Sequence, residues 1–310
     1  MAISDNLDSF AGRPVIDWEV GAVLGDGATT AYRLRLDYDK GNAGLEWGDL
    51  LADFLKDPRS LQTQAMVVGD WGVSTSSDNS SAEAIAALAN AHHNLPNLKY
   101  LFFGDITYEE CEISWLVQGD FSPLLSAYPE LEYLAIRGGQ ELSLGKARHA
   151  KLNTLIIQAG GLSPDVIHQI AAADFPLLEH LELWLGESNY GGDTTVEDIV
   201  PLLKDERFAK LKYLGLKNSE IEDQIAAAVA QAPIVGRLET LDLSMGTLSD
   251  EGARALLASP WVKKLKRLDV HHHYLSDGMQ KQLHALGIDV DSSDPQGEAD
   301  ADNRYVAVGE

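Results

Sequence analysis

The strongest constraint on the fold of this chain is a pattern of spaced leucines that occurs three times between Leu211 and Leu283. Leu-x-x-Leu-x-Leu starts at Leu211 and at Leu238, and a third copy that ends in valine starts at Leu265, so each step is 27 residues. The match continues into a second motif, because Leu-Ser-Asp occurs at 248–250 and again at 275–277. Internal repetition of this kind predicts a repeat architecture before any single residue is interpreted. One unit is expected to be a short strand, a turn and a helix.

A less regular form of the same pattern extends toward the amino terminus. Strands are predicted at 32–36, 66–68, 98–103, 131–136, 152–157 and 178–183, where apolar residues are spaced as in buried strands. Apolar residues at helical spacing occur at 45–55, 82–91, 164–173 and 196–208. Pro96, Pro129 and Pro176 each stand two residues before a strand, and proline ends a preceding helix because it has no N–H to donate. Alternating strands and helices predict an α/β fold.

These leucines, with a further Leu or Ile five positions on, resemble the leucine-rich-repeat superfamily, in particular its ribonuclease-inhibitor-like branch. The sequence is also similar to bacterial cytoplasmic members of that superfamily without an appended enzyme domain. The resemblance implies a horseshoe solenoid with a parallel concave sheet and convex helices, serving as a binding scaffold. One position departs from the family, which usually has Asn or Cys three residues after the last strand leucine. This chain has Gly160, Gly186, Ser219, Gly246 and His273 there.

The repeats are expected to form one continuous domain, since each unit buries its apolar side only against its neighbours. Residues 1–60 are predicted to be an amino-terminal cap with an irregular first repeat, and 61–287 the repeats. Residues 288–310 begin as an acidic tail that cannot bury enough apolar surface to fold alone. Within that tail, Tyr305–Val308 could add a strand to the open edge of the sheet.

Composition narrows the classes of partner. The chain has 24 basic and 48 acidic residues, a net charge of -24, which repels nucleic acids and anionic membranes and favours a basic protein partner. Acidity is also common among soluble proteins and can indicate nothing specific. Cys111 is the sole cysteine, so an intramolecular disulfide is excluded and a reducing compartment is favoured. No apolar run is long enough to cross a bilayer, and a soluble cytoplasmic protein is expected.

Strand geometry predicts which side chains face a partner. The leucines point into the core, so the residues between them line the concave face, where an apolar patch around Phe102, Ala135 and Ile156 is expected. Exposed aromatic residues and Arg are typical of protein-binding surfaces. The predicted partner-binding residues are Tyr100, Phe102, Tyr133, Arg137, Ile156, Gln158, His180, Trp184, Tyr190, Tyr213 and Lys217. Two alternatives stay open: the amino-terminal segment or Tyr305–Val308 covers the patch, or a tightly curved solenoid packs its side chains on one another.

No catalytic, metal or cofactor site is predicted. Consecutive residues of the run 271–273, three histidines, point to opposite faces of a strand, and no second cluster supplies the ligands that zinc needs. A non-enzymatic protein-binding scaffold or inhibitor is therefore expected. One alternative is a regulator of an enzyme, as the GTPase-activating relatives of this branch are. The other is an accessory ligand site of a biosynthetic pathway near Trp184, Tyr190 and Tyr213, with His180 and Lys217 as polar groups.

Overall fold

A computed structural model describes residues 3–204, 206–297 and 303–309, and it confirms an α/β fold of repeated strand-and-helix units. The chain divides into two compact units. The first comprises Ala2–Leu155 with Ala173–Phe175, and the second comprises Ile156–Ala172 with Pro176–Glu310. Strand β7 (Thr154–Gln158) lies at the division.

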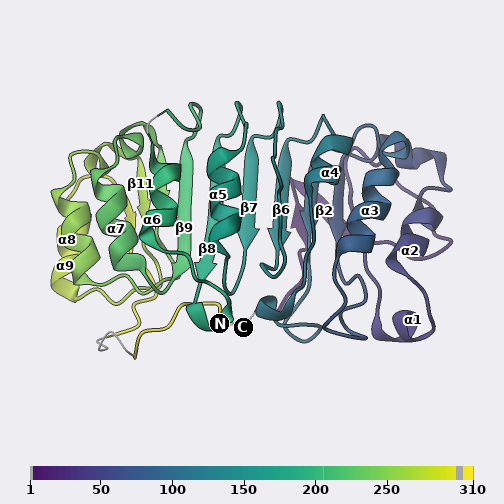
Figure 1. The fold of residues 1–310 in the computed structure, drawn as a ribbon, viewed down its shortest axis with the longest axis horizontal. Coiled ribbons are helices and arrows are strands. Elements are labelled where there is room, and N and C mark those ends of the chain that lie inside the picture. Colours follow the sequence, from purple (N-terminus) through teal and green to yellow (C-terminus); the bar gives the residue numbers. More distant parts are fainter. Residues whose placement is uncertain (1–2, 205, 298–302, 310) are drawn as a thin grey trace. The chain divides into compact units, whose positions relative to one another are not determined.

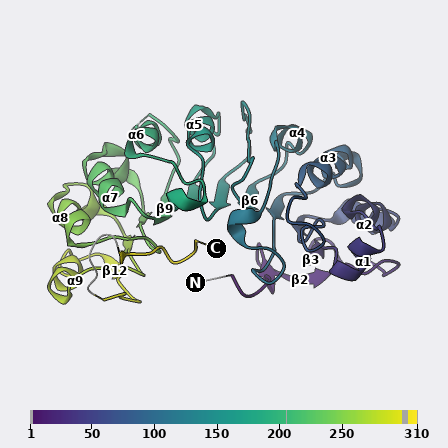
Figure 2. The same cartoon turned by 60° about the horizontal axis from the view of Figure 1, so that its bottom comes forward.

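The first unit holds strands that follow one another in chain order. They are β1 (Ser9–Phe10), β2 (Arg13–Asp17), β3 (Ala31–Leu34), β4 (Ala65–Val68), β5 (Tyr100–Phe103) and β6 (Tyr133–Arg137). Strand β1 pairs antiparallel with β2, and the pairs from β2 to β6 are parallel. The helices are α1 (Tyr38–Asn42), α2 (Trp47–Phe54), α3 (Ala82–Asn90) and α4 (Ser122–Ala127), with 3-10 turns η1 (Pro58–Gln62), η2 (His92–Asn94) and η3 (Ile113–Trp115). Helices α2, α3 and α4 pack side by side against one face of these strands (Figure 2).

The second unit repeats this arrangement with parallel strands only. They are β8 (His180–Gly186), β9 (Tyr213–Ser219), β10 (Thr240–Asp242), β11 (Arg267–Asp269) and β12 (Asp289–Asp291), again in chain order. The helices are α5 (Pro164–Ala172), α6 (Val196–Ile199), α7 (Glu222–Gln231), α8 (Asp250–Ala258) and α9 (Asp277–His284), with 3-10 turns η4 (Ser188–Tyr190), η5 (Val200–Leu203), η6 (Pro233–Arg237) and η7 (Val262–Lys264). Helices α7, α8 and α9 lie next to one another (Figure 1).

The register of the second unit confirms the leucine pattern. Leu181, Leu214, Leu241 and Leu268 occupy matching positions on β8 to β11, and Val290 follows on β12. All five are at most 8% exposed, so the recurring aliphatic position forms one continuous interior. Burial of this apolar surface is the main favourable contribution to folding.

The Leu-Ser-Asp motif has a structural explanation. Ser249 caps α8 by accepting a hydrogen bond from the Glu251 amide, and its hydroxyl donates to Asp223 Oδ2 of the preceding repeat over 2.5 Å. Ser276 does the same for α9, accepting from the Met279 amide and donating to Asp250 Oδ2 over 2.8 Å. The motif therefore ties each helix start to its neighbour, in addition to capping the helix.

Two expectations are corrected, and one departure from the family pattern is explained. The segment 196–208 forms only the single turn α6 and then η5, because Pro201 has no N–H for an α-helical bond. Residues of the predicted acidic tail form β12, which pairs with β11, so that Tyr305–Val308 is not the strand that covers this edge. The side chain of His273 hydrogen-bonds the backbone at the position where the family usually has Asn or Cys. Its Nδ1 accepts from the Leu275 amide, and its Nε2 lies 3.0 Å from the Ser292 carbonyl.

Candidate functional site

The inner face of the first unit is an aromatic patch that the chain itself covers. Phe10 packs on Tyr133 with ring centroids 5.2 Å apart and edge to face, and on Phe102 at 6.2 Å. Arg13 lies over the ring of Tyr100, 4.8 Å from its centroid. Phe10 is 6% and Phe102 3% exposed, so the amino-terminal segment covers the centre of this patch, while Tyr100 and Tyr133 are half-buried. This is one of the alternatives that the sequence left open.

A buried carboxylate anchors the amino-terminal segment. Asp105, which is fully buried, accepts hydrogen bonds from Arg33 Nη1 at 2.8 Å and from the Leu7 amide at 3.1 Å. The Asn6 side chain donates to the Asp105 carbonyl at 3.0 Å. Arg137 lies 3.7 Å from the same carboxylate and 5.0 Å from the Phe102 ring centroid, and burial lowers its pKa to about 10. A buried charge is tolerated only when paired in this way.

The inner face of the second unit is charged, and its centre is Glu182 on β8. Trp184 Nε1 donates to Glu182 Oε1 at 2.8 Å, and Lys217 Nζ lies 3.8 Å from that oxygen and 3.0 Å from Asp242 Oδ2. Burial would raise the pKa of Glu182, but the imidazole of His180 and the charge of Lys217 bring it below its ordinary value. The pKa of Lys217 is raised, because the carboxylates outweigh burial.

Tyr213 joins this cluster through its ring and its hydroxyl. Its ring stacks on His180 with centroids 3.9 Å apart, and its hydroxyl donates to Asp242 Oδ2 over 2.5 Å. Burial and the neighbouring carboxylates raise the pKa of Tyr213. A glycine at 215 is needed here, because an added Cβ would lie 3.1 Å from the Tyr213 ring and 3.3 Å from Glu182.

Acidic side chains continue along β11 and β12 and become more exposed. Arg267 bridges Asp269, Asp289 and Asp291 at 2.7–2.9 Å. The exposed fraction of the side chain is 13% for Asp269, 31% for Asp291 and 63% for Asp289. His271 lies 2.8 Å from Asp269, a contact that raises the pKa of His271, and hydrogen bonds bring the pKa of Asp269 to about 2.

The predicted partner-binding residues are therefore distributed over two different surfaces. The first unit holds Tyr100, Phe102, Tyr133 and Arg137, and the second holds Ile156, Gln158, His180, Trp184, Tyr190, Tyr213 and Lys217. Phe102, Arg137, Trp184 and Lys217 are buried, and the other seven are half-buried. His180, Trp184, Tyr213 and Lys217 come together around Glu182 and Asp242, which were not among the predicted binding residues. Tyr190 lies beside Gly309. Their role in binding stays a prediction.

Glu222, at the start of α7, is a second buried acid of this unit. It is fully buried, and neither carboxylate oxygen has a hydrogen-bond partner among the described residues. Burial raises its pKa well above the ordinary value of 4.5, and the charge of Asp242 adds to this. Burial therefore favours the protonated form of this acid in the folded chain.

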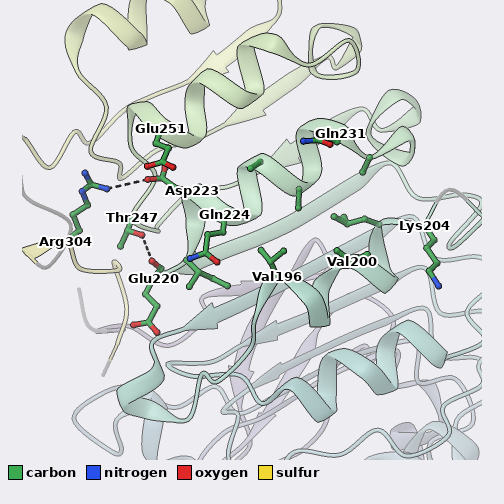
Figure 3. A pocket seen from close by; sticks show the side chains of 15 residues that line it. Val196, Val200, Lys204, Glu220, Asp223, Gln224, Gln231, Thr247, Glu251 and Arg304 are labelled. Carbon is green, nitrogen blue, oxygen red and sulfur yellow. Dashed lines mark hydrogen bonds and ion pairs between the residues drawn. The ribbon is translucent and has the colours of Figure 1, made fainter.

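A groove opens on the helical side of the second unit, between α6 with η5 on one side and α7 on the other (Figure 3). Its volume is about 830 Å³, and Val196 and Val200 face Gln224 across it. Arg304 closes one end, 3.5 Å from Asp223 Oδ2, and Lys204 lies at the other. The groove exists because α6 is a single turn, which leaves the side of α7 partly open.

A metal-binding cluster and a membrane-spanning helix are both absent from the described residues. No group of three His, Cys, Asp or Glu side chains among them could hold a metal ion. None of the helices within these residues has the length and apolar character needed to cross a membrane.

Comparison with solved structures found similar proteins. A protein of Bacteroides fragilis, solved by the Northeast Structural Genomics Consortium, is 34% identical with a TM-score of 0.82, over 90% of this chain and 77% of its own. An internalin of Listeria monocytogenes is 15% identical with a TM-score of 0.36, over 81% of this chain and 72% of its own. No protein-family model and no curated protein matches the chain.

Proposed function

The chain belongs to the same family as the Bacteroides fragilis protein, and we propose that its repeats form a non-enzymatic scaffold that binds a basic protein. Repeat folds of this kind present extended surfaces that typically bind proteins. The ribonuclease-inhibitor-like branch is the finer assignment that the strand-plus-helix repeats support. Regulation of an enzyme and an accessory ligand site remain alternatives.

One observation supports a basic partner, the excess of carboxylates on the inner face of the second unit. Glu182, Asp242, Asp269, Asp289 and Asp291 stand against two cations, Lys217 and Arg267. Five negative charges against two positive ones leave an excess of three. Its accessible part lies on β11 and β12, where Asp289 and Asp291 can pair with Lys or Arg of a partner. Complementary charges of this kind steer association and depend on ionic strength.

The test is affinity purification from the native host with the full chain at low and at moderate salt. Asp289→Asn with Asp291→Asn removes two accessible charges and keeps their shape. The matched control, Glu251→Gln with Asp277→Asn, removes two exposed charges from α8 and α9. A basic protein is expected to be captured by the wild type and the control at low salt, and at least tenfold less by the inner-face variant. Equal capture by both variants, or capture of acidic proteins only, would overturn the proposal.

A further inference from the structure

Residues 304–309 cross the second unit at the ends of β8 to β11, and their backbone is held residue by residue. The amide of Tyr305 donates to Tyr274 Oη at 2.8 Å, and the amide of Val306 donates to Glu187 Oε1 at 3.4 Å. The Ala307 amide donates to the Met245 carbonyl at 2.8 Å. The Val308 amide donates to Asn218 Oδ1 at 2.9 Å. Four consecutive N–H groups thus find acceptors on four successive repeats.

Three contacts come from one recurring position of the repeat. Asn218, Met245 and His272 are 27 residues apart, and all three have a left-handed backbone, with φ of 55°, 68° and 54°. Such φ values are uncommon for residues other than glycine and persist where surrounding structure or function requires them. Each of the three contacts the 304–309 segment, since His272 Nε2 lies 3.3 Å from the Tyr305 carbonyl. We call Glu187, Asn218, Met245, His272 and Tyr274 the track.

The track recognises a backbone more than a set of side chains. The side-chain amide of Asn218 makes two hydrogen bonds to Val308. Its Nδ2 donates to the Val308 carbonyl at 2.6 Å, and its Oδ1 accepts from the Val308 backbone N–H, so it pairs with the segment as a neighbouring strand would. Three consecutive side chains add apolar contacts: Val306, Ala307 and Val308 are 7%, 5% and 4% exposed, while Tyr305 is 64% exposed. Arg304 precedes them and lies 3.5 Å from Asp223. The recognised sequence is a basic residue followed, two to four positions later, by three small apolar residues, of which the first and third are branched.

We propose that the track is a binding site for a segment of a partner protein of the form basic-x-Val-Ala-Val. The 304–309 segment is then an internal occupant that the partner displaces. A tethered segment acts at an effective concentration on the order of millimolar, so a partner segment must compete with it. This site differs from the acidic inner face, because its recognition depends mainly on hydrogen bonds to the backbone and on three apolar side chains. The two proposals can therefore fail separately.

The test uses the full chain with Val306→Asp and Val308→Asp, which expels the internal segment because carboxylates are costly to bury unpaired. The probe is a fluorescent peptide, Arg-Tyr-Val-Ala-Val-Gly, with binding followed by anisotropy. It is expected to bind this variant at least tenfold more tightly than the wild type. Adding Asn218→Leu to the variant should abolish binding, and a peptide with Asp in place of both valines should not bind. Equal binding to wild type and variant, binding that persists without Asn218, or no binding to the folded variant would overturn the proposal.

A second measurement keeps the proposal testable if that variant does not fold. In the otherwise unchanged chain, Asn218→Ala removes both hydrogen bonds to Val308. Hydrogen exchange at the amides of residues 306–308 should then become at least tenfold faster, while exchange in β10 and β11 stays the same. Unchanged protection at 306–308 would show that the track does not hold the segment.

Discussion

The two units are built from the same repeat but have opposite inner faces. In the first, Tyr100, Phe102 and Tyr133 form an aromatic patch that Phe10 covers. In the second, the residues between the buried leucines include Glu182, Asp242 and Asp269, which are paired with cations. The leucine positions fix the interior of both units, whereas the residues between them are free to differ. An apolar inner face needs a cover, and a charged one does not.

The two faces contribute differently to stability. Burial of apolar surface is worth about 25 cal/mol per Å², and aromatic pairs add about 0.5–1.5 kcal/mol each. Exposed ion pairs are worth about 0–1 kcal/mol. The covered face of the first unit therefore stabilises the fold, while the accessible end of the second, on β11 and β12, is available for specificity.

Asp105→Ala is expected to have the largest effect. It leaves Arg33 and Arg137, both buried, without their shared carboxylate, and breaking a buried ion pair costs about 3–5 kcal/mol. The measurement is the free energy of unfolding by urea denaturation. The control is Asp289→Ala in the second unit, where the side chain is 63% exposed and the cost should stay below about 1 kcal/mol. Equal losses of unfolding free energy for the two variants would contradict the expected difference in stability between the two inner faces.

Phe10→Ala should be nearly as costly, about 3 kcal/mol, because it removes a buried ring and leaves a cavity above Phe102 and Tyr133. Urea denaturation gives the loss, and limited proteolysis at residues 3–17 should show that the amino-terminal segment has detached. Tyr305→Ala is the matched control, since this aromatic residue is 64% exposed and should cost less than about 1 kcal/mol. A small loss for Phe10→Ala would mean that the cover is not a stabilising element.

The sequence predicted the interior better than the surfaces. Leucines at a constant step and prolines before strands depend on local rules, so the strands and most helices were placed correctly. Phe10 could not be assigned to the patch, because its contacts with Phe102 and Tyr133 join positions far apart in the chain and no local pattern records them. Strand β12 was missed for a similar reason: Asp289 and Asp291 look like a solvated tail until Arg267 on the neighbouring strand is in place.

Glu222→Gln compares the buried acids of the two units. Asp105 accepts hydrogen bonds from Arg33 and Leu7, whereas the oxygens of Glu222 have no such partners in the described structure. The pKa of Glu222 is raised in the folded state, so the folded chain keeps a proton that the unfolded chain loses above about pH 4.5. The contribution of this acid to stability is therefore lost as pH rises from 4.5 toward the folded pKa.

The variant does not titrate, so its stability relative to the wild type should increase with pH by up to about 1.4 kcal/mol per unit across that window. Urea denaturation at pH 4.5, 5.5, 6.5 and 7.5 measures the difference. Glu251→Gln, at an exposed position of α8, is the control for a general effect of removing an acid. A difference that does not change with pH would show that Glu222 is ionised in the folded chain.

Ser249→Ala is expected to have the smallest effect, and it tests whether successive repeats of the second unit are equivalent. The substitution removes the cap of α8 and the hydrogen bond to Asp223, at a cost of about 1 kcal/mol. Ser276→Ala removes the same pair of contacts one repeat later, to Met279 and Asp250. If the Leu-Ser-Asp motif is a unit of inter-repeat coupling, urea denaturation should give equal losses for the two variants.

Ser249→Asp, which can cap the helix but cannot donate to Asp223, should recover none of the loss, because it places two carboxylates together. Full recovery would mean that capping alone explains the motif and that the bond between repeats contributes nothing.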